Sequence, residues 1–187
     1  MKAPTSNIQA PEKLQIPSAK IFNRQRTRKI NLRLLKRITN AMLVELKIEN
    51  AELGINLAGA KEMAELNWKF LQHQGLTDVI TFDHAENVLS ASWPQNKSEL
   101  PAGCRKHVHG ELFVCVDEAI LQARKFGTSW QSEIVRYIVH GVLHLLGYDD
   151  HRIAARKKMK REENRLLRNL SKKISLAQIA GRSKIST

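Results

Sequence analysis

The stretch HGVLHLLGYDDH, residues 140–151, says most about this chain because it joins a histidine pair to an acidic turn. His140 and His144 are four residues apart, so on a helix both imidazoles lie on one face and can converge on one point. Gly147 lets the chain leave the helix in a left-handed conformation, and the residues after it can fold back toward the same point. Two imidazoles and one ligand from the turn predict a zinc site with an open coordination position, which is the form of a catalytic site.

The acidic turn offers three candidate residues around the metal, and the residues alone leave their roles open. The spacing echoes the zinc-peptidase (metzincin) motif H-E-x-x-H-x-x-G-x-x-H, and Asp150 occupies the position of its last histidine. His151 follows directly, and zinc accepts carboxylate oxygen at nearly the same ~2 Å distance as imidazole nitrogen, so either residue completes a site. Asp149 is expected either to orient a histidine ring or to form a turn with its own backbone. Gly141 stands where the peptidases carry their general-base glutamate, and we interpret it as a position of close packing.

Length and composition indicate one globular domain. The chain has 187 residues, of which 42% are hydrophobic and 26% charged, as is typical of a soluble fold. Two cysteines are too few for a disulfide framework, and no apolar run approaches the ~20 residues of a membrane span. We therefore expect a cytoplasmic protein without a membrane partner, and the sequence does not indicate its oligomeric state.

The net charge of +13 is concentrated toward the two ends of the chain. Lys20 to Arg37 contains eight Lys or Arg and no acid, and Arg152 to Thr187 contains twelve against two Glu. The middle, Ile38 to His151, contains nine basic and fifteen acidic residues. An acidic body with basic ends indicates a polyanionic partner, most simply nucleic acid; the alternative is a solvated surface that keeps the protein soluble.

Periodicity and capping signals predict an α+β fold with about five helices and four short strands. The helices are expected at 31–46, 61–71, 117–126, 128–146 and 153–170, with Asn31 and Asp117 as caps, and the strands at 21–28, 53–57, 77–82 and 111–116. Thr77 and Asp78 are expected to form the entry to the third strand rather than to contact a substrate. A long loop is expected at 84–109. We divide the chain into a disordered lead at 1–19, a single domain at 20–170 and a basic flexible tail at 171–187.

Three segments, in this order and spacing, carry a resemblance to a known family: LNWKFL with LTDVITF at 66–82, GELFVCVDEAILQARKFG at 110–127 and HGVLHLLGYDD at 140–150. With them the chain resembles the YbeY family, the metal-dependent endoribonucleases of rRNA maturation. The resemblance covers roughly residues 21–170 and implies a small mixed sheet packed with helices. It also implies hydrolysis of single-stranded RNA, particularly at the 3′ end of the small-subunit rRNA, with one zinc ion held by three histidines. RNA, especially rRNA of the small ribosomal subunit, is then the expected partner.

The chain departs from the family pattern at two positions. The family motif runs H-G-x-L-H-L-L-G-Y-D-H, and an ungapped match places Asp150 at the third ligand and Met159 at a methionine of the next helix. A one-residue insertion would instead make His151 the ligand, and we favour Asp150 because a substitution is simpler. Leu71 stands where the family usually has an arginine that is implicated in RNA cleavage. Leucine can neither pair with phosphate nor stabilise the charge of a transition state.

Other cations are expected to supply the missing charge. Lys69 and His73 lie beside the substituted position. Arg152, Arg156 and Lys157 lie at the start of the basic helix that follows the acidic turn. We expect these five residues to contact RNA phosphates, with a solvated helix as the alternative.

Together these features predict a metal-dependent, single-strand-specific endoribonuclease in which His140 and His144 act in catalysis through the zinc ion. Zinc lowers the pKa of a bound water toward 7, which matters because the motif contains no general base. Two alternatives stay open. One is a non-catalytic rRNA- or ribosome-assembly factor with a structural zinc, which Leu71 favours, and the other is a metzincin-like peptidase, which Gly141 disfavours.

Overall fold

One four-stranded sheet forms the centre of the protein in the computed structural model, which describes residues 17–84 and 107–181. Its strands are β1 (Ser18–Asn23), β2 (Asn50–Ala58), β3 (Val79–Asp83) and β4 (His107–Cys115). They lie in the order β1-β2-β4-β3, with β1, β2 and β4 parallel and β3 antiparallel at the edge. The expected mixed four-stranded sheet is therefore confirmed.

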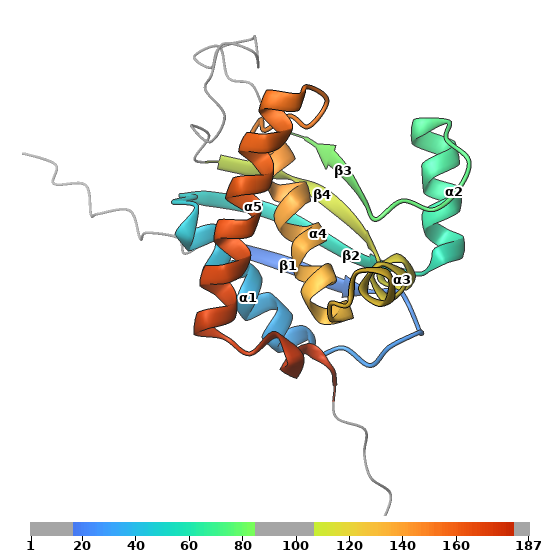
Figure 1. Cartoon of the computed structure of the whole chain (residues 1–187), viewed down its shortest axis with the longest axis horizontal. Helices are drawn as coiled ribbons and strands as arrows, with labels where there is room; N and C mark the ends of the chain where they lie inside the picture. The colour runs from blue at the N-terminus through green and yellow to red at the C-terminus, as the bar shows by residue number, and fades with distance from the viewer. Residues whose placement is uncertain (1–16, 85–106, 182–187) are drawn as a thin grey trace, which may run out of the picture.

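The described residues also form five α-helices, as predicted. They are α1 (Leu32–Glu45), α2 (Ala60–Leu71), α3 (Val116–Phe126), α4 (Trp130–Leu145) and α5 (Ile153–Lys173), and a short 3₁₀ helix, η3 (Leu176–Ile179), follows them. Helices α1 and α4 cover one face of the sheet, and α5 lies outside them as a third layer (Figure 1). Helix α2 stands on the opposite face. Helix α4 lies between the sheet and α5 and is therefore the most buried helix.

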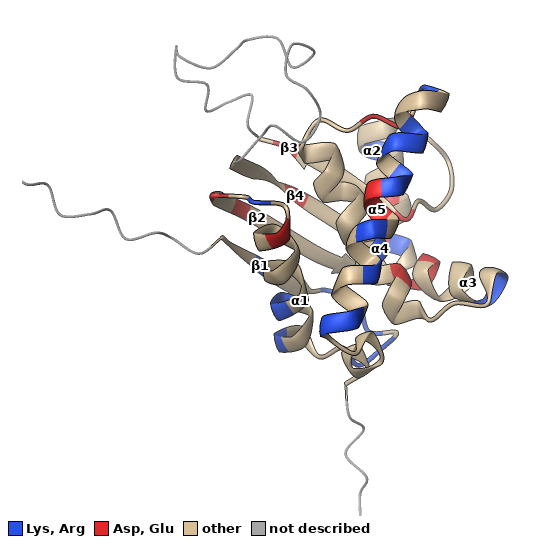
Figure 2. Ribbon diagram, turned by 60° about the vertical axis from the view of Figure 1, so that its left-hand side comes forward, with Lys and Arg blue, Asp and Glu red and all other residues tan. Residues whose placement is uncertain are grey.

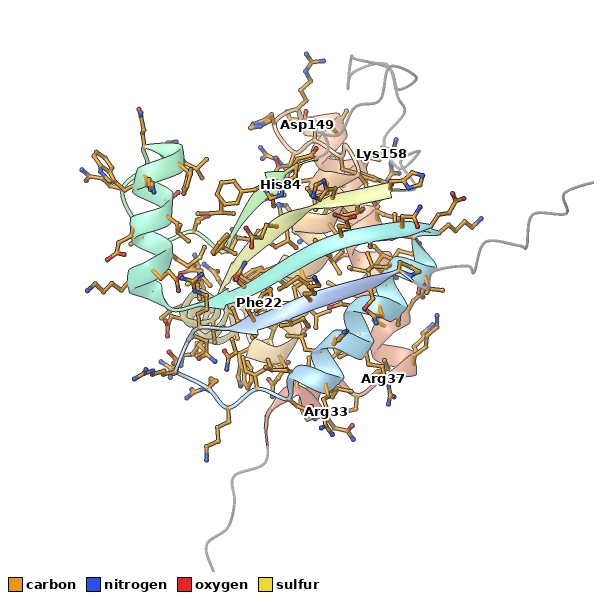
Figure 3. The ribbon with its side chains drawn as sticks, turned by 180° about the vertical axis from the view of Figure 1, so that it is seen from behind. Phe22, Arg33, Arg37, His84, Asp149 and Lys158 are labelled. Atoms are coloured by element: carbon orange, nitrogen blue, oxygen red, sulfur yellow. The ribbon has the colours of Figure 1, made fainter. Side chains whose placement is uncertain are left out.

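Strand β4 shows why the sheet has two apolar faces. Leu112 and Val114 belong to the large core with α1 and α4, whereas Phe113 and Cys115 belong to a smaller cluster with Met63 of α2. Successive side chains of a strand point to opposite faces, so a strand covered on both sides is apolar throughout. Helix α2 covers only part of the second face, and Phe22 of β1 lies half-exposed there (Figure 3).

Gly141 allows α4 to lie close against the sheet. A Cβ atom at this position would lie 2.7 Å from Leu112 Cδ2 and 3.1 Å from Thr81 Oγ1. Both distances are shorter than an ordinary van der Waals contact, so a side chain here would force either the Leu112 side chain or the helix to shift. The close-packing interpretation of Gly141 is therefore confirmed, and the element that approaches it is the sheet.

The cap prediction for Asp117 is wrong in its partner. Helix α3 starts one residue earlier, with Cys115 as its N-cap, and the Asp117 carboxylate instead accepts hydrogen bonds from other elements. Ala60 N donates to Asp117 Oδ2 at 2.6 Å, and Thr27 Oγ1 donates to Asp117 Oδ1 at 2.8 Å. Asp117 thus satisfies the first amide of α2, whose own N-cap, Gly59, has no side chain to do so. The predicted cap Asn31 is confirmed, since it accepts from Leu34 N at 3.1 Å.

The segment 171–181 is packed, although the sequence predicts a flexible tail from 171. Helix α5 continues to Lys173, and Ile174 and Ile179 are buried in the large core. Ala180 forms a β-bridge with Ile30, and Gly181 N donates to Lys29 O at 2.8 Å. The segment therefore packs against the start of α1 and against α4. The stretch ISLAQIA at 174–180 is too short to give a clear periodic signal, which is why the sequence did not predict this packing.

The remaining boundaries differ by a few residues. Strand β1 lies earlier than the predicted 21–28, and β4 begins at His107, inside the predicted loop 84–109. The rest of that loop, most of the predicted lead at 1–19 and the last residues of the tail lie outside the described residues. Among the helices that the structure describes, none combines the length and the apolar character needed to cross a membrane.

Candidate metal centre

The two histidines lie at the exposed end of the most buried helix. His140 and His144 are on the same face of α4, and their side chains are 24% and 30% exposed, whereas most of the helix is buried. Their Nε2 atoms are 3.1 Å apart. The i, i+4 spacing therefore brings both rings to one point, as predicted.

The turn after α4, residues 146–151, returns to this point, and we call it the metal turn. Gly147 has φ +84°, the left-handed conformation that a glycine adopts most easily, and its amide donates to His144 O at 2.9 Å. The turn carries the Asp150 carboxylate back to the rings: its Oδ2 lies 3.7 Å from His140 Nε2 and 4.0 Å from His144 Nε2. Arg156 of α5 holds the turn in place, because its Nε donates to the Asp150 carbonyl at 2.8 Å.

His140, His144 and Asp150, which we call the metal group, offer a set of donor atoms that fits a zinc ion. Bonds of about 2.0–2.1 Å in a tetrahedron place ligand atoms roughly 3.3 Å apart. The three separations here, between 3.1 and 4.0 Å, bracket that value, so closure around an ion needs only small side-chain movements. Two imidazole nitrogens and one carboxylate oxygen are ligands that zinc accepts, and three protein ligands leave a coordination position open.

His151 lies outside this group. Its side chain is 91% exposed, and its Nε2 is 4.0 Å from Asp149 Oδ1 on the outer side of the turn. Among the residues that the structure describes, His151 forms a candidate group with the two acids of the turn, whereas Asp150 forms one with the histidine pair. Of the two candidates for the third ligand, the structure brings Asp150 to the rings.

Each histidine has a hydrogen-bond partner on its other ring nitrogen. With Nε2 directed at the metal position, Nδ1 carries the proton and donates it. His140 Nδ1 lies 3.3 Å from Glu163 Oε2, and His144 Nδ1 lies 3.1 Å from the Tyr148 carbonyl. Such partners fix the ring orientation and the tautomer of a metal-binding histidine.

Glu163 is the one acidic side chain that α5 buries next to the metal group. It is 3% exposed and its Oε1 accepts from Arg136 Nη1 at 2.6 Å and from Lys160 Nζ at 2.7 Å. Burial alone would raise the pKa of Glu163, but the hydrogen bonds from His140, Lys160 and Arg136 outweigh it and lower the pKa to about 2. Glu163 is therefore ionised and can hold the His140 ring through a charge-assisted hydrogen bond.

Sequence reasoning missed Glu163, although a signal was present. It occupies the same helical stripe as Met159, Leu166 and Leu170, all of which are buried. An acid in the apolar stripe of a basic helix indicates a buried carboxylate with partners.

The two imidazoles differ in their affinity for protons. Burial would lower the pKa of His140, but the hydrogen bond and charge of Glu163 raise it overall. Burial and the neighbouring His140 lower the pKa of His144. His144 is thus predisposed to the neutral form that a metal ligand requires.

Asp149 forms a turn instead of orienting a ring. Its Oδ1 accepts from His151 N at 3.0 Å, and this backbone hydrogen bond lowers the pKa of Asp149. The ring nitrogens of the histidines are held by Glu163 and the Tyr148 carbonyl. Figure 3 shows Asp149 at the same end of the molecule as His84, where β3 ends.

The five expected RNA contacts fall into two groups. Arg152, Arg156 and Lys157 lie exposed at the start of α5, directly after the metal turn, although Arg156 uses its Nε on the Asp150 carbonyl. Lys69 and His73 are exposed at the end of α2, on the other side of the sheet. Leu71, the residue that replaces the family arginine, is 49% exposed there.

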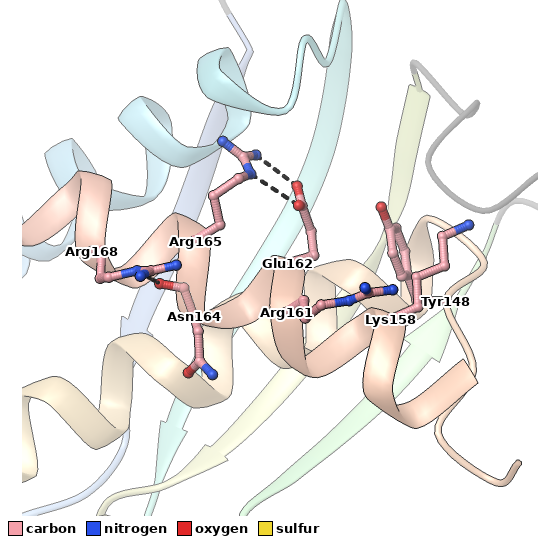
Figure 4. A pocket seen from close by; sticks show the side chains of 7 residues that line it. All are labelled: Tyr148, Lys158, Arg161, Glu162, Asn164, Arg165 and Arg168. Carbon is pink, nitrogen blue, oxygen red and sulfur yellow. Dashed lines mark hydrogen bonds and ion pairs between the residues drawn. The ribbon is translucent and has the colours of Figure 1, made fainter. Parts of the chain in front are cut away.

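Helix α5 also forms a basic cleft that the sequence did not single out. The cleft has a volume of about 440 Å³ and is lined by Tyr148, Lys158, Arg161, Arg165 and Arg168, with Glu162 and Asn164 between them (Figure 4). Arg165 is neutralised by Glu162 at 2.6 Å and by Glu45 at 2.9 Å. Because Tyr148 belongs to the metal turn, the cleft extends the positive surface from the metal group along α5 (Figure 2).

The chain is similar to one family of known proteins. The family model described as "Endoribonuclease YbeY" matches residues 20–171. A protein named "Endoribonuclease YbeY" from Dehalococcoides mccartyi is 32% identical over 147 residues, which are 75% of this chain and 88% of the relative. A protein of the same name from Chlorobium luteolum is 32% identical over 119 residues, 64% of this chain and 74% of the relative.

A solved structure has the same fold. The solution structure of TM1509 from Thermotoga maritima superposes with a TM-score of 0.56 at 19% identity, and the match covers 90% of this chain and 99% of that one. At this identity the similarity concerns the fold, whereas the family rests on the sequence comparisons.

Proposed function

The chain belongs to the YbeY family of metal-dependent endoribonucleases, and from this premise we propose that it cleaves single-stranded RNA in the maturation of the small-subunit rRNA 3′ end. The observation that carries the proposal is the group of His140, His144 and Asp150, whose ligand atoms all lie within 4.8 Å of one another. We assign these three residues as the ligands of one zinc ion per chain.

Zinc held in this way would supply a Lewis acid and activate water for attack on phosphate at neutral pH. The residues of the chain orient the site. Glu163 and the Tyr148 carbonyl hold the Nδ1 protons and thereby direct both Nε2 lone pairs to one point. Arg156 donates to the Asp150 carbonyl and so fixes the turn that carries the Asp150 carboxylate.

The surface of α5 suits the backbone of the substrate. Arg152 and Lys157 flank the metal turn, and Lys158, Arg161 and Arg168 line the basic cleft beyond it. Cations that follow a helix in this way neutralise successive phosphates, and the affinity then falls steeply with salt concentration. We propose that this surface contacts rRNA and the small ribosomal subunit. We also propose that the protein acts in the cytoplasm. Lys69 and His73 would contact RNA only if the strand also reached α2.

The test compares zinc content and cleavage of a single-stranded RNA by the wild type, His144→Ala and His151→Ala. We expect His144→Ala to lose zinc and cleavage, and His151→Ala to keep both because its side chain lies outside the metal group. Equal cleavage by the wild type and His144→Ala would contradict the proposal that this protein cleaves RNA at the metal group.

One observation favours a second candidate function, a ribosome-assembly factor with a structural zinc. Leu71 presents an apolar side chain where the family has a cation, and it is half-exposed. Co-sedimentation with small subunits, together with absence of cleavage by the zinc-loaded wild type, would favour this function.

A peptidase is disfavoured by packing. A glutamate at position 141 has no room, because even a Cβ would lie 2.7 Å from Leu112 Cδ2. The position that serves metalloproteases as general base is therefore closed in this fold.

A further inference from the structure

A second cavity lies one helical turn from the metal group. It has a volume of about 360 Å³ and is formed by the segment before β3, by α3 and by α4. Glu133 and Tyr137 of α4 line it, and they continue the helical stripe that carries His140 and His144. One turn of a helix advances about 5 Å, so Tyr137 at the cavity lies about that far along α4 from His140 at the metal group.

Tyr137 contributes a buried polar group without a partner. The residue is 4% exposed, and its hydroxyl has no hydrogen-bond partner within the described part of the chain. Burial, together with the charges of Asp78 and Glu133, raises the pKa of Tyr137, so the hydroxyl keeps its hydrogen. A buried hydroxyl is rarely left unpaired, and the one here belongs to a residue that lines an open cavity.

Two carboxylates supply acceptors in the same cavity. Asp78 uses Oδ1 to accept from Val79 N at 2.8 Å, which confirms its predicted place at the entry to the strand. Glu118 accepts from Gln122 Nε2 at 2.5 Å through Oε1. Within the described part of the chain, the second oxygen of each carboxylate has no hydrogen-bond partner, and both residues line the cavity.

The third carboxylate of the cavity is already paired. Glu133 accepts from Thr128 Oγ1 at 2.7 Å and lies 3.2 Å from Arg136 Nε. Arg136 in turn contacts Glu163, which holds the His140 ring. The cavity is therefore negative through Asp78 and Glu118, and it disfavours a phosphate group.

Two apolar side chains stand at the edge of the cavity. Phe126 at the end of α3 is 66% exposed and Leu76 is 41% exposed. Unpaired bases stack on exposed aromatic rings of this kind, while their edges form hydrogen bonds with polar groups deeper in the site.

Resting on the proposed function, we propose that this cavity binds one unpaired base of the RNA substrate, and that it accepts bases with an amino group (cytosine, adenine or guanine) and disfavours uracil. The amino group donates to the carboxylates of Asp78 and Glu118, as carboxylates accept from the amino group of cytosine elsewhere. A ring nitrogen or carbonyl accepts from the Tyr137 hydroxyl. A plain ammonium ion would leave that hydroxyl hydrogen unpaired. Uracil has no amino group and offers only its single N3–H, so it loses one of the two hydrogen bonds to the carboxylates.

The test titrates the zinc-loaded full chain with cytidine, adenosine, guanosine and uridine, followed by NMR. Nucleosides carry no phosphate, so their binding does not report on the metal. We expect the three amino nucleosides to shift resonances of α3 and α4 and to bind about fivefold more tightly than uridine, as the loss of one hydrogen bond implies. Equal binding of uridine, or no binding of any nucleoside, would overturn the proposal.

Variants locate the binding. Phe126→Ala and Tyr137→Phe are expected to weaken amino-nucleoside binding by about fivefold or more, while zinc content stays unchanged. The matched control is Leu121→Ala, which also removes an exposed apolar side chain from α3 but lies outside the cavity lining. Identical binding by Phe126→Ala and Leu121→Ala would contradict the location.

A second arm distinguishes substrate from effector, using short RNAs that differ in one base. Oligonucleotide binding that follows the nucleoside preference supports the proposal. Binding of free nucleosides with no base preference among oligonucleotides would overturn it in favour of a nucleotide effector site. RNA cleavage without nucleoside binding would refute the base site alone, and selective nucleoside binding without any RNA cleavage would refute the proposed activity alone.

Discussion

Replacing Glu163 by glutamine should weaken zinc binding without touching a metal ligand. The substitution keeps the shape of the side chain but removes the charge that holds His140 Nδ1, Arg136 and Lys160. A pKa lowered from 4.5 to about 2 corresponds to about 3 kcal/mol of preference for the ionised form, shared among three partners. The share of His140, about 1 kcal/mol, and the usual effect of losing such a partner predict zinc binding about 10- to 100-fold weaker.

The assay is competition for zinc with a chromophoric chelator. Glu162→Gln is the matched control, because this neighbouring carboxylate pairs with Arg165 instead of with a histidine of the metal group. Wild-type zinc affinity for Glu163→Gln, or equal losses in both variants, would refute the positioning role of Glu163.

The same residue predicts a pH dependence of the metal-free protein. Because the folded-state pKa of Glu163 is depressed, its contribution to stability is fully present above the unfolded value near 4.5 and is lost as the pH falls toward about 2. Urea unfolding between pH 6 and 3 should therefore show a steeper loss of stability in the wild type than in Glu163→Gln. Parallel pH profiles would contradict the assignment of this carboxylate as ionised.

Three further predictions concern packing and charge. Gly141→Ala should destabilise the fold by about 1–3 kcal/mol in urea unfolding, because the added Cβ meets Leu112 and Thr81 of the sheet; wild-type stability would show that the helix can move away freely. Ile179→Ala should cost about 2–4 kcal/mol, since the side chain is fully buried, and a neutral effect would mean that the segment 171–181 does not pack in solution. Arg161→Ala should reduce the slope of log affinity for RNA against log salt by about one, whereas an unchanged slope would exclude a phosphate contact in the basic cleft.

Local spacing predicted the features that depend on a few neighbouring residues. The convergence of His140 and His144 follows from helix geometry, and the left-handed conformation of Gly147 follows from its place after the last helical turn. The order of helices and strands and the mixed sheet followed from periodicity together with the family resemblance.

Features that depend on contacts far apart in the sequence could not be predicted in this way. The choice between Asp150 and His151 depends on the path of the turn, which Arg156 of the next helix fixes. Glu163 lies 23 residues from His140, and Asp117 caps a helix 57 residues away. In each case the residue type was visible in the sequence, but its partner was defined only by the packing of another element.

Native mass spectrometry of the zinc-loaded full chain tests the central claim most directly, for the wild type, Asp150→Ala and His151→Ala. The arrangement of His140, His144 and Asp150 predicts one zinc ion in the wild type, its loss in Asp150→Ala and its retention in His151→Ala. A wild-type chain that stays metal-free in excess zinc, or a zinc ion lost in His151→Ala and kept in Asp150→Ala, would contradict it.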